Sequence, residues 1–155
     1  MYSNSFSINF DRFEKTMELI KTFKTETEKE TVQAALELAT IFSAGDVVLL
    51  EGDLGTGKTF LVKALCRIWE TIDEAASPTF AIIHLYRGPQ PVNHFDLYRI
   101  EDVNELDNLG WEEFLETDAV TFIEWPLILE PQLEKYYKIK INLQGSKRIF
   151  KLYKN

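Results

Sequence analysis

Residues 45–69 read GDVVLLEGDLGTGKTFLVKALCRIW, and this stretch decides the fold. It contains the pattern Gly52-x-x-x-x-Gly57-Lys58-Thr59. In such a loop the glycines let the backbone wind closely around a phosphate so that successive N–H groups point inward. The lysine adds a mobile positive charge and the threonine hydroxyl is a ligand for Mg²⁺. The pattern therefore predicts a loop that binds a polyphosphate.

The residues on either side of the loop match the surroundings that such a loop needs. Val47–Leu50 is a short, unbroken apolar run of valine and leucine, as expected of a strand that is covered on both faces. After the loop, apolar residues recur at helical spacing: Phe60, Leu61, Ala64, Leu65 and Ile68. The helix would direct its free N–H groups and its partial positive charge at the phosphates. The alternative is a glycine-rich turn that binds nothing, but pattern, strand and helix all agree on a phosphate site.

Composition and length predict one globular domain over residues 1–155, large enough to bury a core. No segment reaches the apolar length of a membrane span, and Met1–Phe10 lacks the basic and apolar regions of an export signal. The only cysteine, Cys66, excludes an internal disulfide and suits a reducing compartment. We therefore expect a cytoplasmic protein.

The net charge of −8 is unevenly distributed along the chain. Residues Glu101–Glu134 hold eleven carboxylates and no Lys or Arg, whereas Lys135–Asn155 holds seven Lys or Arg and no carboxylate side chain. These blocks are either solvated faces and lysine-protected strand edges or surfaces that orient a protein partner. The overall acidity argues against direct binding of nucleic acid, which requires clustered positive charge.

Helix and strand signals continue on both sides of the loop. Thr27-x-x-Glu30 is a capping box, and the apolar residues after it predict a helix that ends before Gly45. Residues 1–26 carry weaker signals, and Leu19 to Phe23 fits either a strand or a helix end.

Two β-hairpins are predicted further along the chain, and they define the fold class. The first joins Ala81–Arg87 to Val92–Tyr98, and the second joins Tyr136–Leu143 to Arg148–Tyr153. With the loop strand and a buried strand at Ala119–Ile123, they predict an α/β, three-layer P-loop NTPase fold. Its central sheet would be mixed, mostly parallel, with antiparallel hairpins.

Two carboxylates compete for the metal at the ends of predicted strands. Alternation places His94, Asp96 and Tyr98 on one face of their strand, where they form either a metal or nucleophile site or a hydrogen-bonded surface triplet. Glu124 directly follows a buried strand, the position at which P-loop sites hold Mg²⁺. Trp125 would either stack on a base or fill the core.

Several segments occur in the order and spacing of the TsaE family, formerly YjeE, of small bacterial P-loop ATPases. They are GDLGTGKT at 52–59, SPTF at 77–80, HFDLYR at 94–99, EL with LG between 105 and 110, and EWP at 124–126. HFDLYR and EWP are more specific than the phosphate loop. Residues 1–24 match no motif of the family and form an N-terminal extension.

The resemblance implies ATP hydrolysis that supports threonylcarbamoyladenosine formation at position 37 of tRNAs reading codons that begin with A. The implied partner is the TsaB–TsaD heterodimer, and tRNA would be contacted only through that complex. Under the resemblance, ATP would contact Asp53, Leu54, Gly55, Thr56, Gly57, Lys58, Thr59, Phe60, Thr79 and Trp125. The expected Mg²⁺ ligands are Thr59, Glu124 and Asp96, and the expected catalytic residues are Asp96, Glu124 and Lys58. His94, Tyr98 and Arg99 match motif positions without an assigned role.

Three other functions share parts of this pattern. A GTPase would carry the Asn-Lys-x-Asp guanine signature, which is absent, so ATP is preferred. A small-molecule kinase usually needs an arginine-rich lid, whereas the arginines here are few and scattered: Arg12, Arg67, Arg87, Arg99 and Arg148. A nucleotide-dependent binding module with negligible hydrolysis of its own stays open as the third alternative.

Overall fold

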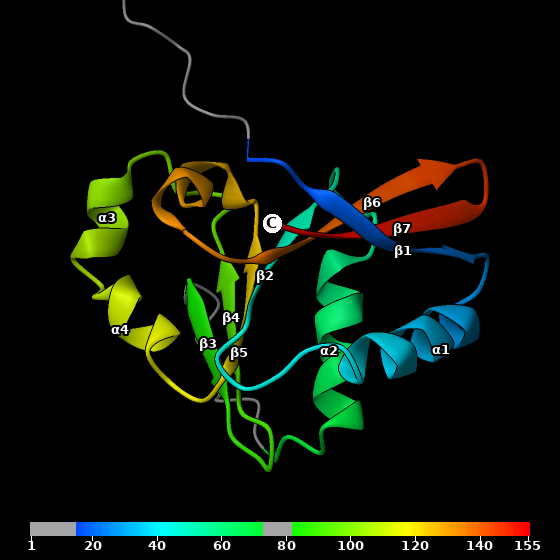
Figure 1. Cartoon of the computed structure of the whole chain (residues 1–155), viewed down its shortest axis with the longest axis horizontal. Helices are drawn as coiled ribbons and strands as arrows, with labels where there is room; N and C mark the ends of the chain where they lie inside the picture. The colour runs from blue at the N-terminus through cyan, green and yellow to red at the C-terminus, as the bar shows by residue number, and fades with distance from the viewer. Residues whose placement is uncertain (1–14, 73–81) are drawn as a thin grey trace, which may run out of the picture.

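The computed structural model describes residues 15–72 and 82–155, and within them seven strands form one sheet (Figure 1). The strands are β1 (Glu18–Thr25), β2 (Val47–Glu51), β3 (Ile83–Tyr86), β4 (Val92–Asp96), β5 (Val120–Glu124), β6 (Tyr137–Gln144) and β7 (Lys147–Lys154). The helices are α1 (Glu28–Ala39), α2 (Lys58–Ile68), α3 (Val103–Asp107) and α4 (Trp111–Leu115), followed by 3₁₀ turns η1 (Pro126–Ile128) and η2 (Glu130–Gln132).

The phosphate-loop strand β2 lies at the centre of the sheet, in the order β1-β7-β6-β2-β5-β4-β3. It runs parallel to β5 and β6, and β4 runs parallel to β5. The outer pairs β3–β4, β6–β7 and β1–β7 are antiparallel. The predicted mixed sheet with a parallel centre is confirmed, and the carboxyl ends of β2, β4 and β5 meet at one edge.

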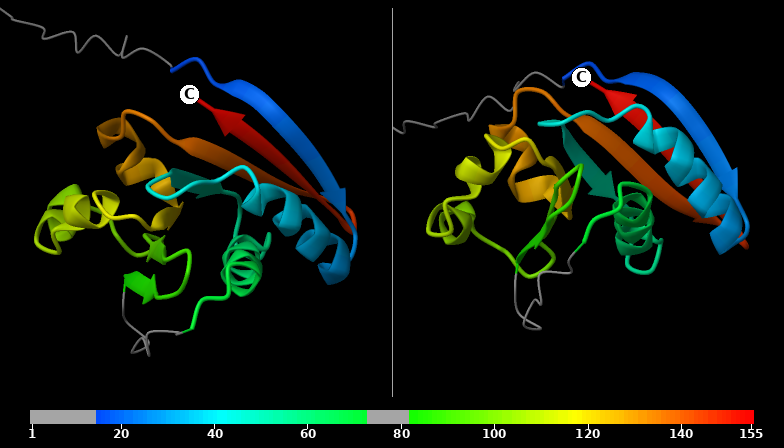
Figure 2. Two further views of the ribbon diagram at one scale, coloured as in Figure 1. Left: turned by 60° about the horizontal axis from the view of Figure 1, so that its bottom comes forward. Right: turned by 90° about the horizontal axis from the view of Figure 1, so that it is seen from below.

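Helices cover both faces of the central strands and make three layers (Figures 1 and 2). On one face, Val48 and Leu50 of β2 pack with residues of α1 and α2. On the other face, Val47 and Leu49 pack with Leu106 of α3 and with residues of α4 and the 3₁₀ turns. Because successive side chains of a strand point to opposite faces, an unbroken apolar run is what a strand covered on both sides requires.

The first helix begins as its sequence predicts, with one difference in the cap. Thr27 is the N-cap, and its Oγ1 accepts the Glu30 N–H at 3.2 Å. The Glu30 carboxylate accepts the N–H of Glu26 at 2.7 Å, one residue earlier than the capping box predicts. The cap is therefore present, but its return bond is displaced by one residue.

Residues Leu19 to Phe23, which the sequence fitted to either a strand or a helix end, lie in the edge strand β1, which pairs with β7. Residues 1–14 lie outside the described part of the chain. In residues 15–72 and 82–155, no helix combines the length and apolar character needed to cross a membrane.

Candidate nucleotide-binding site

The phosphate loop joins the end of β2 to the start of α2 in a tight backbone path. A Cβ added at Gly52 would lie 2.7 Å from the Ile141 carbonyl oxygen and 2.8 Å from Thr56 Oγ1, so only glycine fits there. Gly57, which caps α2, has a φ of +105°, in the region that favours glycine. Thr56 closes the turn, because its Oγ1 donates to the Asp53 carbonyl oxygen at 2.9 Å. The two outer glycines of the pattern are thus required by close approach and by backbone conformation.

Lys58 lies folded back over the loop from the first turn of α2. Its Nζ donates to the carbonyl oxygens of Gly52 at 2.6 Å and Asp53 at 2.9 Å, and it lies 4.1 Å from the centroid of the Trp125 ring. Burial lowers the pKa of Lys58, and the nearby carboxylates, with Glu124 the strongest, oppose that shift. Two backbone carbonyl oxygens and the Trp125 ring therefore hold the lysine's ammonium group beside the loop.

Glu124 at the end of β5 is the most enclosed carboxylate of the site. It is only 3% exposed, and its Oε1 accepts hydrogen bonds from Thr59 Oγ1 at 2.7 Å and His94 Nε2 at 2.8 Å. Burial by itself raises the pKa of this carboxyl group. The hydrogen bonds from His94 and Thr59, together with the charge of Lys58, outweigh burial and hold this pKa below its usual range. Glu124 is thus a buried anion fixed directly against the phosphate loop.

Asp96 at the end of β4 stands opposite Glu124 in the strand register but has different surroundings. Its side chain is exposed, and its Oδ1 accepts the backbone N–H of Tyr98 at 3.1 Å. The alternative of a His–Asp–Tyr triplet is wrong, because His94 turns to Glu124 instead. Both carboxylates nonetheless lie at the same sheet edge.

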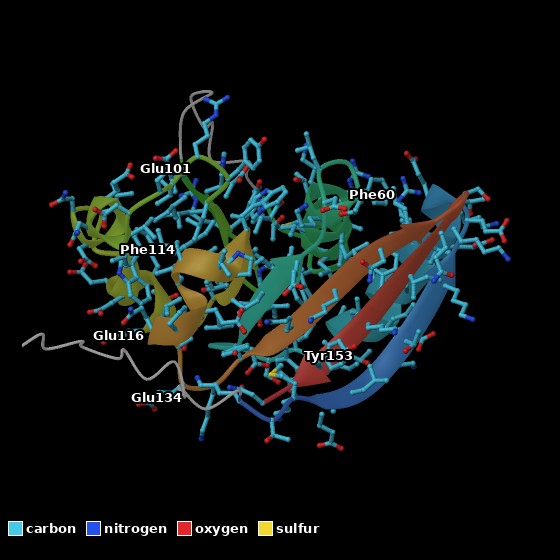
Figure 3. The ribbon with its side chains drawn as sticks, turned by 90° about the horizontal axis from the view of Figure 1, so that it is seen from above. Phe60, Glu101, Phe114, Glu116, Glu134 and Tyr153 are labelled. Atoms are coloured by element: carbon cyan, nitrogen blue, oxygen red, sulfur yellow. The ribbon has the colours of Figure 1, made fainter. Side chains whose placement is uncertain are left out.

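A cavity of about 260 Å³ brings most of the predicted site residues together. Its lining consists of Leu54, Gly55, Gly57, Lys58, Thr59, Phe60, Asp96, Tyr98, Glu124 and Trp125. Asp53 instead lines a neighbouring cavity of about 340 Å³ on the other side of Trp125. Figure 3 shows Phe60 on α2, away from the acidic α3–α4 side of the molecule that carries Glu116. The predicted Thr79 lies outside the described residues.

Trp125 forms a wall of the site between the two cavities. Its backbone has a φ of +56°, which is unusual for a residue with a side chain. The ring contacts Tyr98 with centroids 4.9 Å apart and faces the Lys58 ammonium group. It also packs against the apolar cluster on the face of the sheet that α3 and α4 cover. Trp125 therefore does more than fill the core, because one side of it faces the phosphate loop.

Two contributors to the site were not assigned a role from the sequence. His94 stood out as part of a motif, but its partner Glu124 is 30 residues away. Arg148 was grouped with the scattered arginines, yet its Nε donates to the Thr56 carbonyl oxygen at 3.1 Å across 92 residues. Alternation marked the strand of Arg148, but no spacing in the sequence connects that residue to the loop.

Comparison with known proteins agrees with the motif order. The family model described as "Threonylcarbamoyl adenosine biosynthesis protein TsaE" matches residues 25–150. The chain belongs to the TsaE family. It is 38% identical to the tRNA threonylcarbamoyladenosine biosynthesis protein TsaE of Bacillus subtilis, over 72% of this chain and 70% of that protein. The TsaE protein of Aquifex aeolicus is 31% identical over 82% of this chain and 98% of its own length.

A solved structure extends the TsaE comparison to the fold. The crystal structure of YdiB from Bacillus subtilis superposes with a TM-score of 0.71 and 27% identity, covering 90% of this chain and 87% of that one. The TsaE family model begins at residue 25, so the extension that matches no motif also precedes the matched region. The whole described site, including Arg148, falls inside the matched region.

The residues of this TsaE site fit a magnesium ion that is shared with a nucleotide. Among the described residues, no three His, Cys, Asp or Glu side chains are grouped closely enough to hold a metal by themselves. Mg²⁺ in nucleotide sites typically takes one or two carboxylates and leaves its other positions to phosphate oxygens and water. The Thr59 hydroxyl and the Glu124 carboxylate, 2.7 Å apart, supply hard oxygen ligands of that kind.

Proposed function

We propose that this chain is a Mg²⁺-dependent ATPase that supports threonylcarbamoyladenosine formation at position 37 of tRNA, acting with a TsaB–TsaD heterodimer. One observation carries the ATPase part: a phosphate loop whose Thr59 hydroxyl is bonded to Glu124, a buried carboxylate on the neighbouring strand. Relatives named for tRNA threonylcarbamoyladenosine biosynthesis support the tRNA part.

The phosphate loop binds the polyphosphate through its backbone. The N–H groups at the start of α2 have no partner within the helix, and they carry the positive end of the helix dipole. Lys58 exchanges its carbonyl partners, Gly52 and Asp53, for phosphate oxygens, and its lowered pKa reflects the burial that a bound anion would compensate. Trp125 and Tyr98 form part of the wall of the cavity.

Glu124 and Asp96 have different roles in the proposed reaction. Glu124 holds the Thr59 hydroxyl in place and presents a fixed anion for the metal, which when bound neutralises charge on the phosphates. Asp96 is exposed at the same edge, so it is free to orient the attacking water and to accept its proton. His94 donates to Glu124 and keeps its carboxylate oriented.

Exposed apolar side chains next to the site support a protein partner there. Leu54 of the phosphate loop is 73% exposed, and Leu127 just after Trp125 is 85% exposed. Tyr98, which lines the cavity, is 57% exposed. Large apolar side chains grouped around a cavity are common at interaction sites. A partner that covers them would exclude water from the cavity and raise a slow intrinsic turnover.

Phosphate release from ATP tests the proposal. The purified chain is measured alone and with the TsaB–TsaD heterodimer, with and without Mg²⁺, and Lys58→Ala serves as the blank. We expect slow Mg²⁺-dependent turnover that rises with the heterodimer and is absent in the blank. If turnover does not change with the heterodimer but rises with a small phosphate acceptor, the chain would be a kinase rather than this ATPase. A chain that binds ATP but never turns it over would be a nucleotide-dependent binding module.

A further inference from the structure

The C-terminal hairpin β6–β7 contacts the phosphate loop at both ends of the loop. At the start, the position of a Cβ on Gly52 lies 2.7 Å from the Ile141 carbonyl oxygen of β6. At the end, Arg148 of β7 donates from Nε to the Thr56 carbonyl oxygen at 3.1 Å. The hairpin thus contacts the loop at its start and near its end, although it lies far from the loop in sequence.

Arg148 differs from Lys147 and Lys138 of the same hairpin in its partners. Lys147, the preceding residue, pairs with Glu26 at 3.0 Å, and Lys138 pairs with Glu130 at 2.5 Å. Within residues 15–72 and 82–155, Arg148 has no carboxylate partner and is partly buried against the loop. Its Nε lies 3.5 Å from the Cβ position of Gly57. An arginine without an anionic partner beside a phosphate loop leaves its positive charge available to that loop.

The bond to Thr56 determines which way the next N–H points. In a trans peptide the C=O of one residue and the N–H of the next point in opposite directions. Because Arg148 holds the Thr56 carbonyl toward the hairpin, the N–H of Gly57 is directed away from the hairpin. Gly57 is the residue least able to maintain this orientation alone, because glycine adopts positive and negative φ with similar ease.

We infer that Arg148 is a positioning residue of the nucleotide site. It fixes the Thr56–Gly57 peptide so that the Gly57 N–H is directed at the phosphates, and its charge adds to the attraction for the anion. This role rests on the proposed nucleotide binding and assigns one of its determinants to the C-terminal hairpin, outside the motifs that identify the site. The expected ligand group is the phosphate chain rather than the base or ribose.

A matched pair of variants tests this role. Arg148→Met and Lys147→Met remove the same charge from adjacent residues, but only the first removes the bond to the loop. Dissociation constants are measured by calorimetry for Mg²⁺–ADP and for tripolyphosphate, which lacks base and sugar. We expect Arg148→Met to weaken both ligands on the order of tenfold, as loss of a charged hydrogen bond implies. Lys147→Met should stay within about twofold of the wild type.

The outcomes separate this inference from the proposed function. Wild-type protein that binds neither ligand would refute the proposed function itself. If the wild type binds and Arg148→Met binds equally well, the positioning role is refuted while the function stands. A loss for ADP without a loss for tripolyphosphate would also refute it, because Arg148 would then act on the base or sugar. Melting temperatures check folding, and Arg148→Gln takes over the comparison if Arg148→Met is unfolded.

Discussion

The ends of β4 and β5 carry carboxylates that are neighbours in the sheet and yet have opposite surroundings. Glu124 on β5 is buried and accepts two side-chain hydrogen bonds, whereas Asp96 on β4 is exposed and accepts one bond from a nearby backbone N–H. A buried carboxylate that accepts two hydrogen bonds is fixed in place, while an exposed carboxylate keeps its freedom to move. Under the proposed function, we expect Glu124 to bind the metal and anchor the loop, and Asp96 to orient the attacking water.

Replacing Glu124 should have the largest effect. Glu124→Gln keeps the shape and an oxygen that can accept from Thr59, but it removes the charge. We expect ATP turnover to fall roughly 10²- to 10³-fold, the range for removing a main electrostatic contribution. The melting temperature should fall slightly as well, because the hydrogen-bonded Glu124 anion stabilises the fold above pH 4.5. Phosphate release and thermal melts measure both, and turnover near the wild-type value would remove Glu124 from the mechanism.

Replacing His94 should have the next largest effect, because it acts through Glu124. His94→Leu removes the donor to Glu124 Oε1, and we expect turnover to fall about tenfold, as for other groups that orient a metal ligand. His94→Gln can still donate from its amide and should retain most of the activity. The required Mg²⁺ concentration should rise in the leucine variant and not in the glutamine variant. Equal activity of the two variants would contradict the positioning role.

The third variant, Asp96→Asn, separates activity from stability. The Asp96 side chain is exposed, and the amide oxygen of asparagine can still accept the Tyr98 N–H, so the free energy of unfolding should stay within about 0.5 kcal/mol of the wild type. Turnover should still fall about tenfold, since proton acceptance by a positioned group contributes at least that much. Urea unfolding and phosphate release provide the two measurements. A destabilised Asp96→Asn would show that Asp96, like Glu124, contributes to stability, despite its exposed position.

The pH dependence of stability should give the smallest effect. The folded pKa of Glu124 lies below the usual 4.5, so this group stabilises the fold above that pH. The contribution decreases as the pH falls below 4.5 and through the lowered pKa, because the unfolded chain then binds the proton more readily. We expect the difference in unfolding free energy between the wild type and Glu124→Gln to shrink on acidification. A difference that is constant down to about pH 3 would contradict the lowered pKa.

Much of the fold was predictable because its signals are local. The apolar run of β2, the cap at Thr27 and the alternation of both hairpins each depend on a few adjacent residues. The loop and both strand-end carboxylates were predictable for the same reason, since a strand's last residue marks a definite edge of a parallel sheet.

Two of the unpredicted features depend on contacts between distant residues. The choice of His94 between Asp96 and Glu124 depends on how β4 and β5 are aligned, which no single segment encodes. The approach of Arg148 to Thr56 requires that β6 pair beside β2, so that the hairpin passes the loop. The displaced cap bond of Glu30 is a local detail, but its choice between two adjacent N–H groups depends on the exact backbone path.

Metal affinity in the nucleotide complex tests the central claim most directly. Binding of Mn²⁺ in the presence of ADP can be followed by electron paramagnetic resonance in the wild type, Glu124→Gln and Asp96→Asn. The account predicts that Glu124→Gln loses metal affinity on the order of tenfold or more, while Asp96→Asn stays close to the wild type. The reverse order, with Asp96→Asn losing the metal and Glu124→Gln retaining it, would contradict the division of roles between the two strand ends.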